Sequence, residues 1–195
     1  MIYNDVIIGT TDSKNVIVNK NELVARIGNG INLDTPSIQK YIKKYNENVV
    51  YRYAYTKINF KCSEGISYFE DEKVNSITLE KVLKDSKEVF LLVVTAGIGI
   101  DKLIAKTAIQ NPVESFYIDA IASAGIESYI DYINNMICDG LKVTKRFSPG
   151  YADFPIEFQN YILHRVSANK NIGIMLSDNY LMIPTKSITA VIGIK

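Results

Sequence analysis

The chain has 195 residues, of which 47% are apolar and 22% charged, and its 22 Lys and Arg residues nearly balance its 21 Asp and Glu residues. This composition is typical of a folded globular protein and excludes a disordered tail or a fibrous repeat. The formal net charge of +1 gives no broad attraction for nucleic acid or for an anionic membrane. We therefore predict one folded domain over residues 1–195 that binds neither nucleic acid nor a membrane.

The cysteines and the start of the chain favour a soluble, cytoplasmic protein. Cys62 and Cys138 lie far apart and form no Cys-x-x-Cys pair, which is typical of free thiols in a reducing compartment. Residues 1–9 include Asp5 and have no basic stretch before an apolar run, so they make a poor signal peptide. No segment approaches the roughly 20 apolar residues that a membrane span requires.

The first elements along the chain are two helices. Residues 20–27 indicate a short helix that ends at Gly28. A second helix should begin at residues 34–36, where Asp or Thr caps it and proline occupies the first turn. Its apolar stripe consists of Ile38, Tyr41, Ile42 and Tyr45.

The next segment, residues 50–62, has the period-two pattern of a strand. Its apolar positions change phase, so a bulge or bend near Thr56-Lys57 is expected, in a bent antiparallel strand or a twisted hairpin arm. The two sets are first Tyr51, Tyr53 and Tyr55 and then Ile58, Phe60 and Cys62. The three tyrosines could form a stacking platform for a ligand, although packing at the edge of the core is favoured.

The middle of the chain predicts a buried strand between helices. A brief helix near residues 79–83 precedes the unbroken apolar run 90–94, which indicates a strand covered on both faces. Gly97 and Gly99 then turn the chain into another helix. Asn111-Pro112 caps and opens the longest helix, over residues 112–138, and Gly140 ends it.

The last third predicts a strand at 141–147, a tight loop at 148–151, a helix from Asp153 to about Ser167, and three short strands. These strands are expected near residues 172–176, 180–183 and 187–194. Because helices and strands do not alternate regularly, the predicted fold class is α+β: a twisted, largely antiparallel sheet with flanking helices.

Several common kinds of site are absent from the sequence. His164 is the single histidine and has no cysteine near it at ligand spacing, so neither a zinc site nor a Ser-His-Asp triad is expected. No Gly-x-x-x-x-Gly-Lys loop is present. Gly97-Ile98-Gly99 follows a strand, as in dinucleotide-binding proteins, but Lys102 stands where the third glycine would be. A plain strand-to-helix turn is therefore favoured.

Glu127 and Asp131 lie one turn apart on the longest predicted helix. They could form a metal site or an acid and base pair. Because no nitrogen ligand or second acidic cluster accompanies them, a solvated helix face is favoured.

Residues 146–151, Arg-Phe-Ser-Pro-Gly-Tyr, are the segment best suited to a ligand. Arg146 offers a planar, two-pronged donor for a carboxylate. Gly150 would let a ligand approach the main chain of the turn, and Tyr151 offers a flat ring that attracts a cation. A zwitterion with a carboxylate and an onium centre would match these groups. From the residues alone, a turn that serves only as scaffolding remains the alternative.

This segment also begins an ordered set of motifs. It continues with Gln159, residues 173–178, 182–184 and 187–189, and upstream with Thr95-Ala96-Gly97-Ile98 and Asp119-Ala120. The set resembles the activation domain of cobalamin (vitamin B12)-dependent methionine synthase, with its Arg-x-x-x-Gly-Tyr element. The resemblance covers residues 80–193. Residues 1–75, the N-terminal lobe, are more similar to the short stand-alone relatives of this domain.

The resemblance implies a role in reductive reactivation. In the family, an electron from a flavodoxin-like donor regenerates Co(I) on the corrinoid cofactor, and S-adenosylmethionine held by this domain methylates it. Such a protein contributes positioning rather than acid–base chemistry. By position, Arg146 would contact the carboxylate of S-adenosylmethionine, Ser148 and Gly150 would offer main-chain contacts, and Tyr151 would lie beside the ligand and the corrin face.

The expected partner is a cobalamin-binding methionine synthase or another corrinoid protein. In longer relatives an upstream aspartate contacts the ligand and an aromatic pair follows the final strand. This sequence has no counterpart of that pair, and Asp12, Asp34 and Asp71 all lack the surrounding motif. Two alternatives therefore stay open: a non-catalytic module that docks on a corrinoid protein without using S-adenosylmethionine, and an unrelated small-molecule binder with a similar turn.

Overall fold

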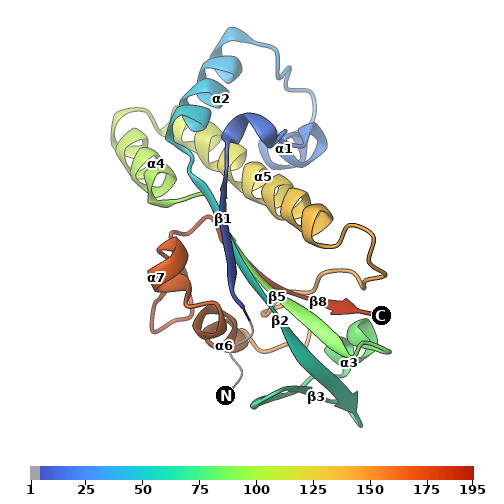
Figure 1. Ribbon diagram of the computed structural model, residues 1–195. Coiled ribbons are helices and arrows are strands. Elements are labelled where there is room, and N and C mark those ends of the chain that lie inside the picture. Colours follow the sequence, from blue (N-terminus) through green and yellow to red (C-terminus); the bar gives the residue numbers. More distant parts are fainter. Residues whose placement is uncertain (1–4) are drawn as a thin grey trace.

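The computed structural model, which describes residues 5–195, contains a six-stranded antiparallel sheet with helices on both faces (Figure 1). The strands are β1 (Ile7–Thr11), β2 (Tyr51–Ser63), β3 (Ile66–Phe69), β4 (Glu72–Asn75), β5 (Glu88–Thr95), β6 (Met175–Leu176), β7 (Met182–Ile183) and β8 (Ser187–Ile194). The strand order is β4-β3-β2-β5-β8, and β1 pairs with β2 on the edge that β3 also uses. A separate hairpin contains β6 and β7.

Two groups of helices cover the two faces of the sheet. One face packs against α1 (Lys20–Ile27), α2 (Pro36–Asn48), α4 (Ile98–Gln110) and α5 (Pro112–Ile137). The other packs against α3 (Ile77–Leu83), α6 (Phe158–Arg165) and α7 (Ala168–Ile172). Figure 1 shows the first group above the sheet and the second below it. This arrangement confirms the predicted α+β class.

The central strand β5 confirms that an unbroken apolar run is buried on both faces. Alternate side chains of a strand point to opposite faces. Phe90, Leu92 and Val94 accordingly lie in the core beneath α5. Their neighbours Val89, Leu91 and Val93 lie in the core beside α6.

The predicted bulge in β2 is wrong. Its register with β5 runs without interruption from Arg52, opposite Thr95, to Asn59, opposite Glu88. The apolar positions change phase because the two halves of this strand contact different helices. Its tyrosines pack toward α5, whereas Ala54, Ile58 and Phe60 pack into the core on the opposite face.

The two glycines before α4 allow close packing of the backbone. Gly97 has a φ of +81°, a conformation that favours glycine. A Cβ atom at Gly99 would lie 2.6 Å from the carbonyl oxygen of Asn48, at the end of α2. Both glycines are therefore explained by the turn itself, and the structure supports the strand-to-helix interpretation.

Other elements in the last third differ from the prediction. Residues 141–147 form an irregular segment that bonds to β8 at Val143 and Phe147, not a regular strand. The helix expected from Asp153 begins only at Phe158, because the Asp153 carboxylate caps α3 instead. The first of the three short strands was expected near residues 172–176. In the structure α7 ends at Ile172, and the strand β6 covers only Met175–Leu176. Within residues 5–195, no helix is long and apolar enough to cross a membrane.

Candidate ligand-binding cleft

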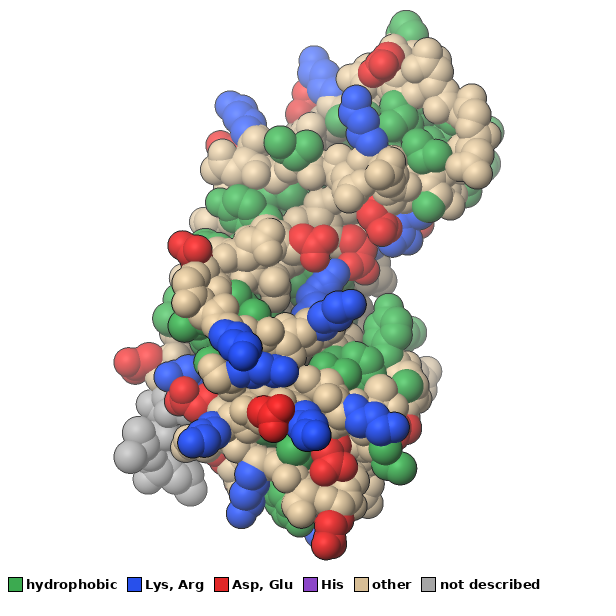
Figure 2. Space-filling model, turned by 90° about the vertical axis from the view of Figure 1, so that its right-hand side faces the viewer, with side chains coloured by type: hydrophobic (Ala, Val, Ile, Leu, Met, Phe, Trp, Pro, Cys, Tyr) green, Lys and Arg blue, Asp and Glu red, His purple; other side chains and the backbone are tan. Residues whose placement is uncertain are grey.

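A cleft of about 380 Å³ lies where α5, the 146–151 segment and β8 meet. Figure 2 shows acidic side chains facing basic ones across the middle of the molecule on this side. The structure brings three of the four predicted site residues, Arg146, Ser148 and Tyr151, to its wall. The full lining is Glu127, Arg146, Phe147, Ser148, Pro149, Tyr151, Ile156, Gln159, Met182, Ser187, Ile188 and Thr189.

The turn at 146–151 is held in place from both sides. Phe147 exchanges two backbone hydrogen bonds with Val191 of β8, at 2.9 and 2.8 Å. At Gly150 the φ of +88° closes the turn, and the Gly150 N–H donates to the carbonyl oxygen of Phe154 at 2.8 Å. Gly150 itself does not line the cleft, and its N–H is already used, so the predicted main-chain contact could involve only its carbonyl oxygen.

Arg146 forms ion pairs with two carboxylates of α5. Its Nη2 atom donates to Glu127 Oε2 at 3.0 Å and lies 3.2 Å from Asp131 Oδ1. The Nε atom is buried and has no hydrogen-bond partner among the described residues. The ion pairs contradict the solvated helix face predicted for Glu127 and Asp131. Only Asp131, whose side chain is 65% exposed, remains mostly in solvent.

The acidic pair belongs to a longer polar stripe on α5. Asp119 and Ser123 occupy the two preceding helical turns, and both contact Lys186, at 2.7 and 2.8 Å from its Nζ atom. Residues four apart share one face of a helix, so all four polar side chains point the same way. Arg146 and Lys186 thus connect this face of α5 to the segments beside the cleft, the 146–151 turn and the start of β8.

The opposite end of the cleft is neutral. Ile156 and Met182 supply apolar surface, and Gln159 is a polar residue that is only 4% exposed. On the floor, the Ser187 hydroxyl is bonded to the Pro184 carbonyl oxygen at 2.7 Å and to the Thr95 hydroxyl at 2.9 Å. The cleft therefore has a charged end, near α5, and a neutral end, near α6.

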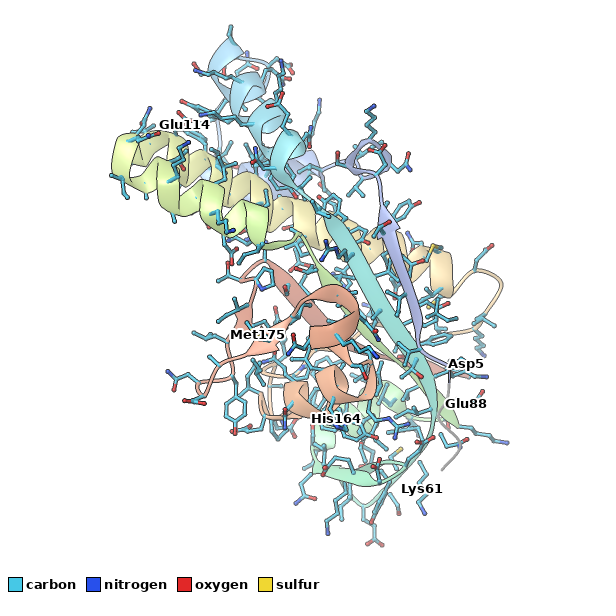
Figure 3. The ribbon with its side chains drawn as sticks, turned by 60° about the vertical axis from the view of Figure 1, so that its left-hand side comes forward. Asp5, Lys61, Glu88, Glu114, His164 and Met175 are labelled. Carbon is cyan, nitrogen blue, oxygen red and sulfur yellow. The ribbon has the colours of Figure 1, made fainter. Side chains whose placement is uncertain are left out.

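The other side chains considered from the sequence lie elsewhere. His164 is exposed on α6 (Figure 3). Burial raises the pKa of the Cys62 and Cys138 thiols, which makes both less reactive. Residues 5–195 contain no group of three or more His, Cys, Asp or Glu side chains that could hold a metal ion.

The tyrosines of β2 serve packing. The Tyr51 hydroxyl lies 2.6 Å from that of Tyr45, and burial raises the pKa of Tyr51 to about 12. None of the three aspartates weighed from the sequence lines the cleft. Asp12 caps a 3₁₀ turn and Asp71 contacts Arg165. The acid that lines the cleft is Glu127, and the four-residue spacing of polar groups on α5 was the signal that could have identified it.

Comparison with known proteins establishes the fold. No protein-family model and no curated protein sequence matches the chain. A solved structure described as the MetH reactivation domain bound to AdoHcy matches with a TM-score of 0.69, at 13% sequence identity. The match covers 98% of this chain and 79% of that one. At this level of identity the likeness shows a shared fold, which can support several functions.

Proposed function

We propose that this protein binds S-adenosylmethionine in the cleft and presents its methyl group to the cob(I)alamin of a partner corrinoid protein. The reaction class is the reductive reactivation of cobalamin-dependent methionine synthase, with a flavodoxin-like protein as the electron donor. The observation that carries the proposal is the position of Arg146, Ser148 and Tyr151 together on the wall of one cleft.

The chemistry of the cleft fits this ligand. Its volume of about 380 Å³ falls within the range of roughly 300–1,000 Å³ that is usual for small-molecule sites. A guanidinium suits the ligand's carboxylate, and Glu127 can attract its positively charged groups. Ile156 and Met182 suit a flat, uncharged ring at the other end. The polar and apolar parts of the cleft thus follow the same order as those of the ligand.

The residues of the cleft also fit a reaction that needs no acid–base catalyst. The reduced cobalt of the partner supplies a strong nucleophile, and the sulfonium group of the ligand activates its own methyl group. The protein's contribution is then orientation and exclusion of water, which the buried floor of the cleft can provide. This role requires no catalytic histidine, which is consistent with a chain whose single histidine, His164, is exposed on α6.

Exposed apolar side chains around the cleft support a partner protein. Tyr151 is 64% exposed at the edge of the cleft, and Leu181, beside the lining residue Met182, is 66% exposed. Met175 lies opposite Ile183 in the β6–β7 hairpin and is also exposed (Figure 3). Large apolar groups gathered beside a ligand site are typical of a surface that another protein covers.

The ion pairs of Arg146 favour a second candidate, a docking module that binds a corrinoid protein without using S-adenosylmethionine. Glu127 and Asp131 already occupy the Nη2 atom. If the ligand's carboxylate could not share the guanidinium, the cleft would lack its main anchor. The fold and the apolar border would then serve only association.

A calorimetric titration separates the two candidates. S-adenosylmethionine is titrated into the protein alone and into its mixture with cobalamin-loaded methionine synthase from which the activation domain has been removed. Binding in either case, followed by methylcobalamin formation under reducing conditions, is the expected result. Association with the corrinoid protein without any binding of S-adenosylmethionine would support the docking module. If neither event occurs, both candidates are wrong.

A further inference from the structure

Gln159, at the neutral end of the cleft, combines deep burial with a side-chain oxygen that no described residue bonds. It is the second residue of α6 and is 4% exposed. Its Nε2 atom donates to the carbonyl oxygen of Tyr180, in the loop between β6 and β7, at 3.3 Å. No hydrogen bond to its Oε1 atom is made within residues 5–195.

The bond to Tyr180 fixes which end of the Gln159 amide is left free for a ligand. A carbonyl oxygen can only accept a hydrogen bond, so the nitrogen of the Gln159 amide must point toward it. The Oε1 atom, on the opposite edge of the same planar amide, is thereby left as a hydrogen-bond acceptor. This oxygen is not among the fully buried unpaired atoms of the described residues, so solvent can reach it, and in the cleft either water or a ligand can donate to it.

The surroundings of Gln159 define the kind of ligand group that it can recognise. Ile156 and Met182 flank it with apolar surface, and Arg146 and Glu127 lie at the charged end. A flat heterocycle fits between apolar side chains, and only a donor on its edge can satisfy an acceptor. An exocyclic amino group is such a donor, whereas an exocyclic oxygen would place two acceptors against each other.

We infer that Gln159 accepts a hydrogen bond from the exocyclic amino group of the ligand's purine, so that the cleft selects an adenine over its 6-oxo counterpart. This inference rests on the proposed function, because it assigns the neutral end of the cleft to the ring of the bound nucleoside. Gln159 is then a specificity-determining residue. Loss of its contact should reduce the preference for adenine more than it reduces the binding of the amino-acid end of the ligand.

The test compares two ligands that differ only at this position, S-adenosylhomocysteine and S-inosylhomocysteine, by isothermal titration calorimetry. The wild-type protein is expected to prefer the adenosyl compound roughly 10- to 100-fold, as sites that pair a buried polar group with a ligand donor do. In Gln159→Leu the preference should fall below about threefold. Gln110→Leu, which changes an exposed glutamine at the end of α4, is the matched control and should keep the wild-type preference.

The outcomes distinguish this inference from the proposed function. Equal binding of the two ligands by the wild-type protein overturns the inference and leaves the proposed function intact, and this comparison needs no variant. A preference that persists in a folded Gln159→Leu protein also overturns it, because another group must then read the ring. If the wild-type protein binds neither ligand, alone or with the corrinoid partner, the proposed function fails and the inference fails with it.

Discussion

Arg146 Nη2 and Glu127 Oε2 lie 3.0 Å apart, which ties the turn that borders the cleft to the long helix α5. Asp131, one turn further along the helix, lies 3.2 Å from the same nitrogen. A guanidinium has five N–H donors, so these contacts leave others for a ligand. The carboxylate of a bound amino acid would share Arg146 with α5 rather than replace it.

Replacement of Arg146 by alanine is expected to weaken S-adenosylmethionine binding by about 1.5–3 kcal/mol, or roughly 10- to 150-fold. The variant removes the donor for the ligand's carboxylate. It also leaves Glu127 and Asp131 without their cation, and these acids would then repel that carboxylate. Isothermal titration calorimetry measures the change.

A second arginine provides the control for this substitution. Arg26 pairs with Glu22 on α1, so Arg26→Ala removes the same charge away from the cleft. Its affinity for S-adenosylmethionine should remain within about twofold of wild type. If Arg146→Ala keeps the wild-type affinity, the assigned carboxylate contact is wrong.

Asp131→Asn is expected to change the affinity in the opposite direction. Asp131 contacts Arg146 but does not line the cleft, so its neutralisation leaves more of the cation's charge for the ligand. Exposed ion pairs contribute about 0.2–1 kcal/mol, which corresponds to a gain in affinity of about 1.5- to 5-fold.

The effect of Asp131→Asn should be largest at low ionic strength, because salt screens exposed charges. Asp139→Asn removes an exposed acid from the segment after α5, and no ion pair involves Asp139 within residues 5–195. It should leave the affinity unchanged. Weaker binding by Asp131→Asn would mean that this acid holds Arg146 in its binding position instead of competing for it.

The parts of the site that could be predicted are local in sequence. Arg146 and Tyr151 lie five residues apart around a Pro-Gly turn, so the sequence alone brings them to one surface. The partner of Arg146 could not be identified in this way, because Glu127 comes from a different element and meets the arginine only through the packing of α5. Gln159 belonged to the ordered set of motifs, but its role at the neutral end depends on its contact with Tyr180.

The same distinction between local and long-range contacts decides which parts of the fold could be predicted. The capping of α5 by Asn111 and the burial of β5 follow from adjacent residues, and both predictions are confirmed. The edge strand β1 was not predicted because its residues are largely exposed, so no alternation of apolar and polar side chains marks it. In β2 the alternation is present but changes face, and only the arrangement of the helices shows why.

Gly150→Ala and Gly140→Ala are expected to destabilise the protein by similar amounts. Both glycines have positive φ values, +88° and +72°, so each substitution should cost about 1 kcal/mol in backbone strain. A Cβ atom at Gly140 would meet open space, and one at Gly150 would lie 2.9 Å from Ile156 Cδ1, the end of a flexible, exposed side chain that can move aside at little cost. Urea denaturation gives the two free energies of unfolding, and a much larger loss for Gly150→Ala would show that Ile156 cannot move.

The hydrogen bonds of Asp153 predict a dependence of stability on pH. The Ser76 hydroxyl, 2.7 Å away, the Ile77 N–H and the Thr78 N–H all donate to its carboxylate, and together they lower its pKa from 3.8 to about 2. Since the folded state holds the proton less tightly than the unfolded state, the carboxylate stabilises the fold above about pH 4. That contribution is lost as the pH falls from about 4 to about 2.

Asp153→Asn tests this dependence, because it keeps the shape of the side chain and removes its charge. Urea denaturation at pH 7 should show the variant to be less stable than wild type, and the difference should shrink between pH 4 and pH 2 as the wild-type carboxylate takes up its proton. Asp139→Asn, the exposed control, should differ little from wild type across the same range. A stability difference for Asp153→Asn that stays constant down to pH 2 would show that the charge of Asp153 does not stabilise the start of α3.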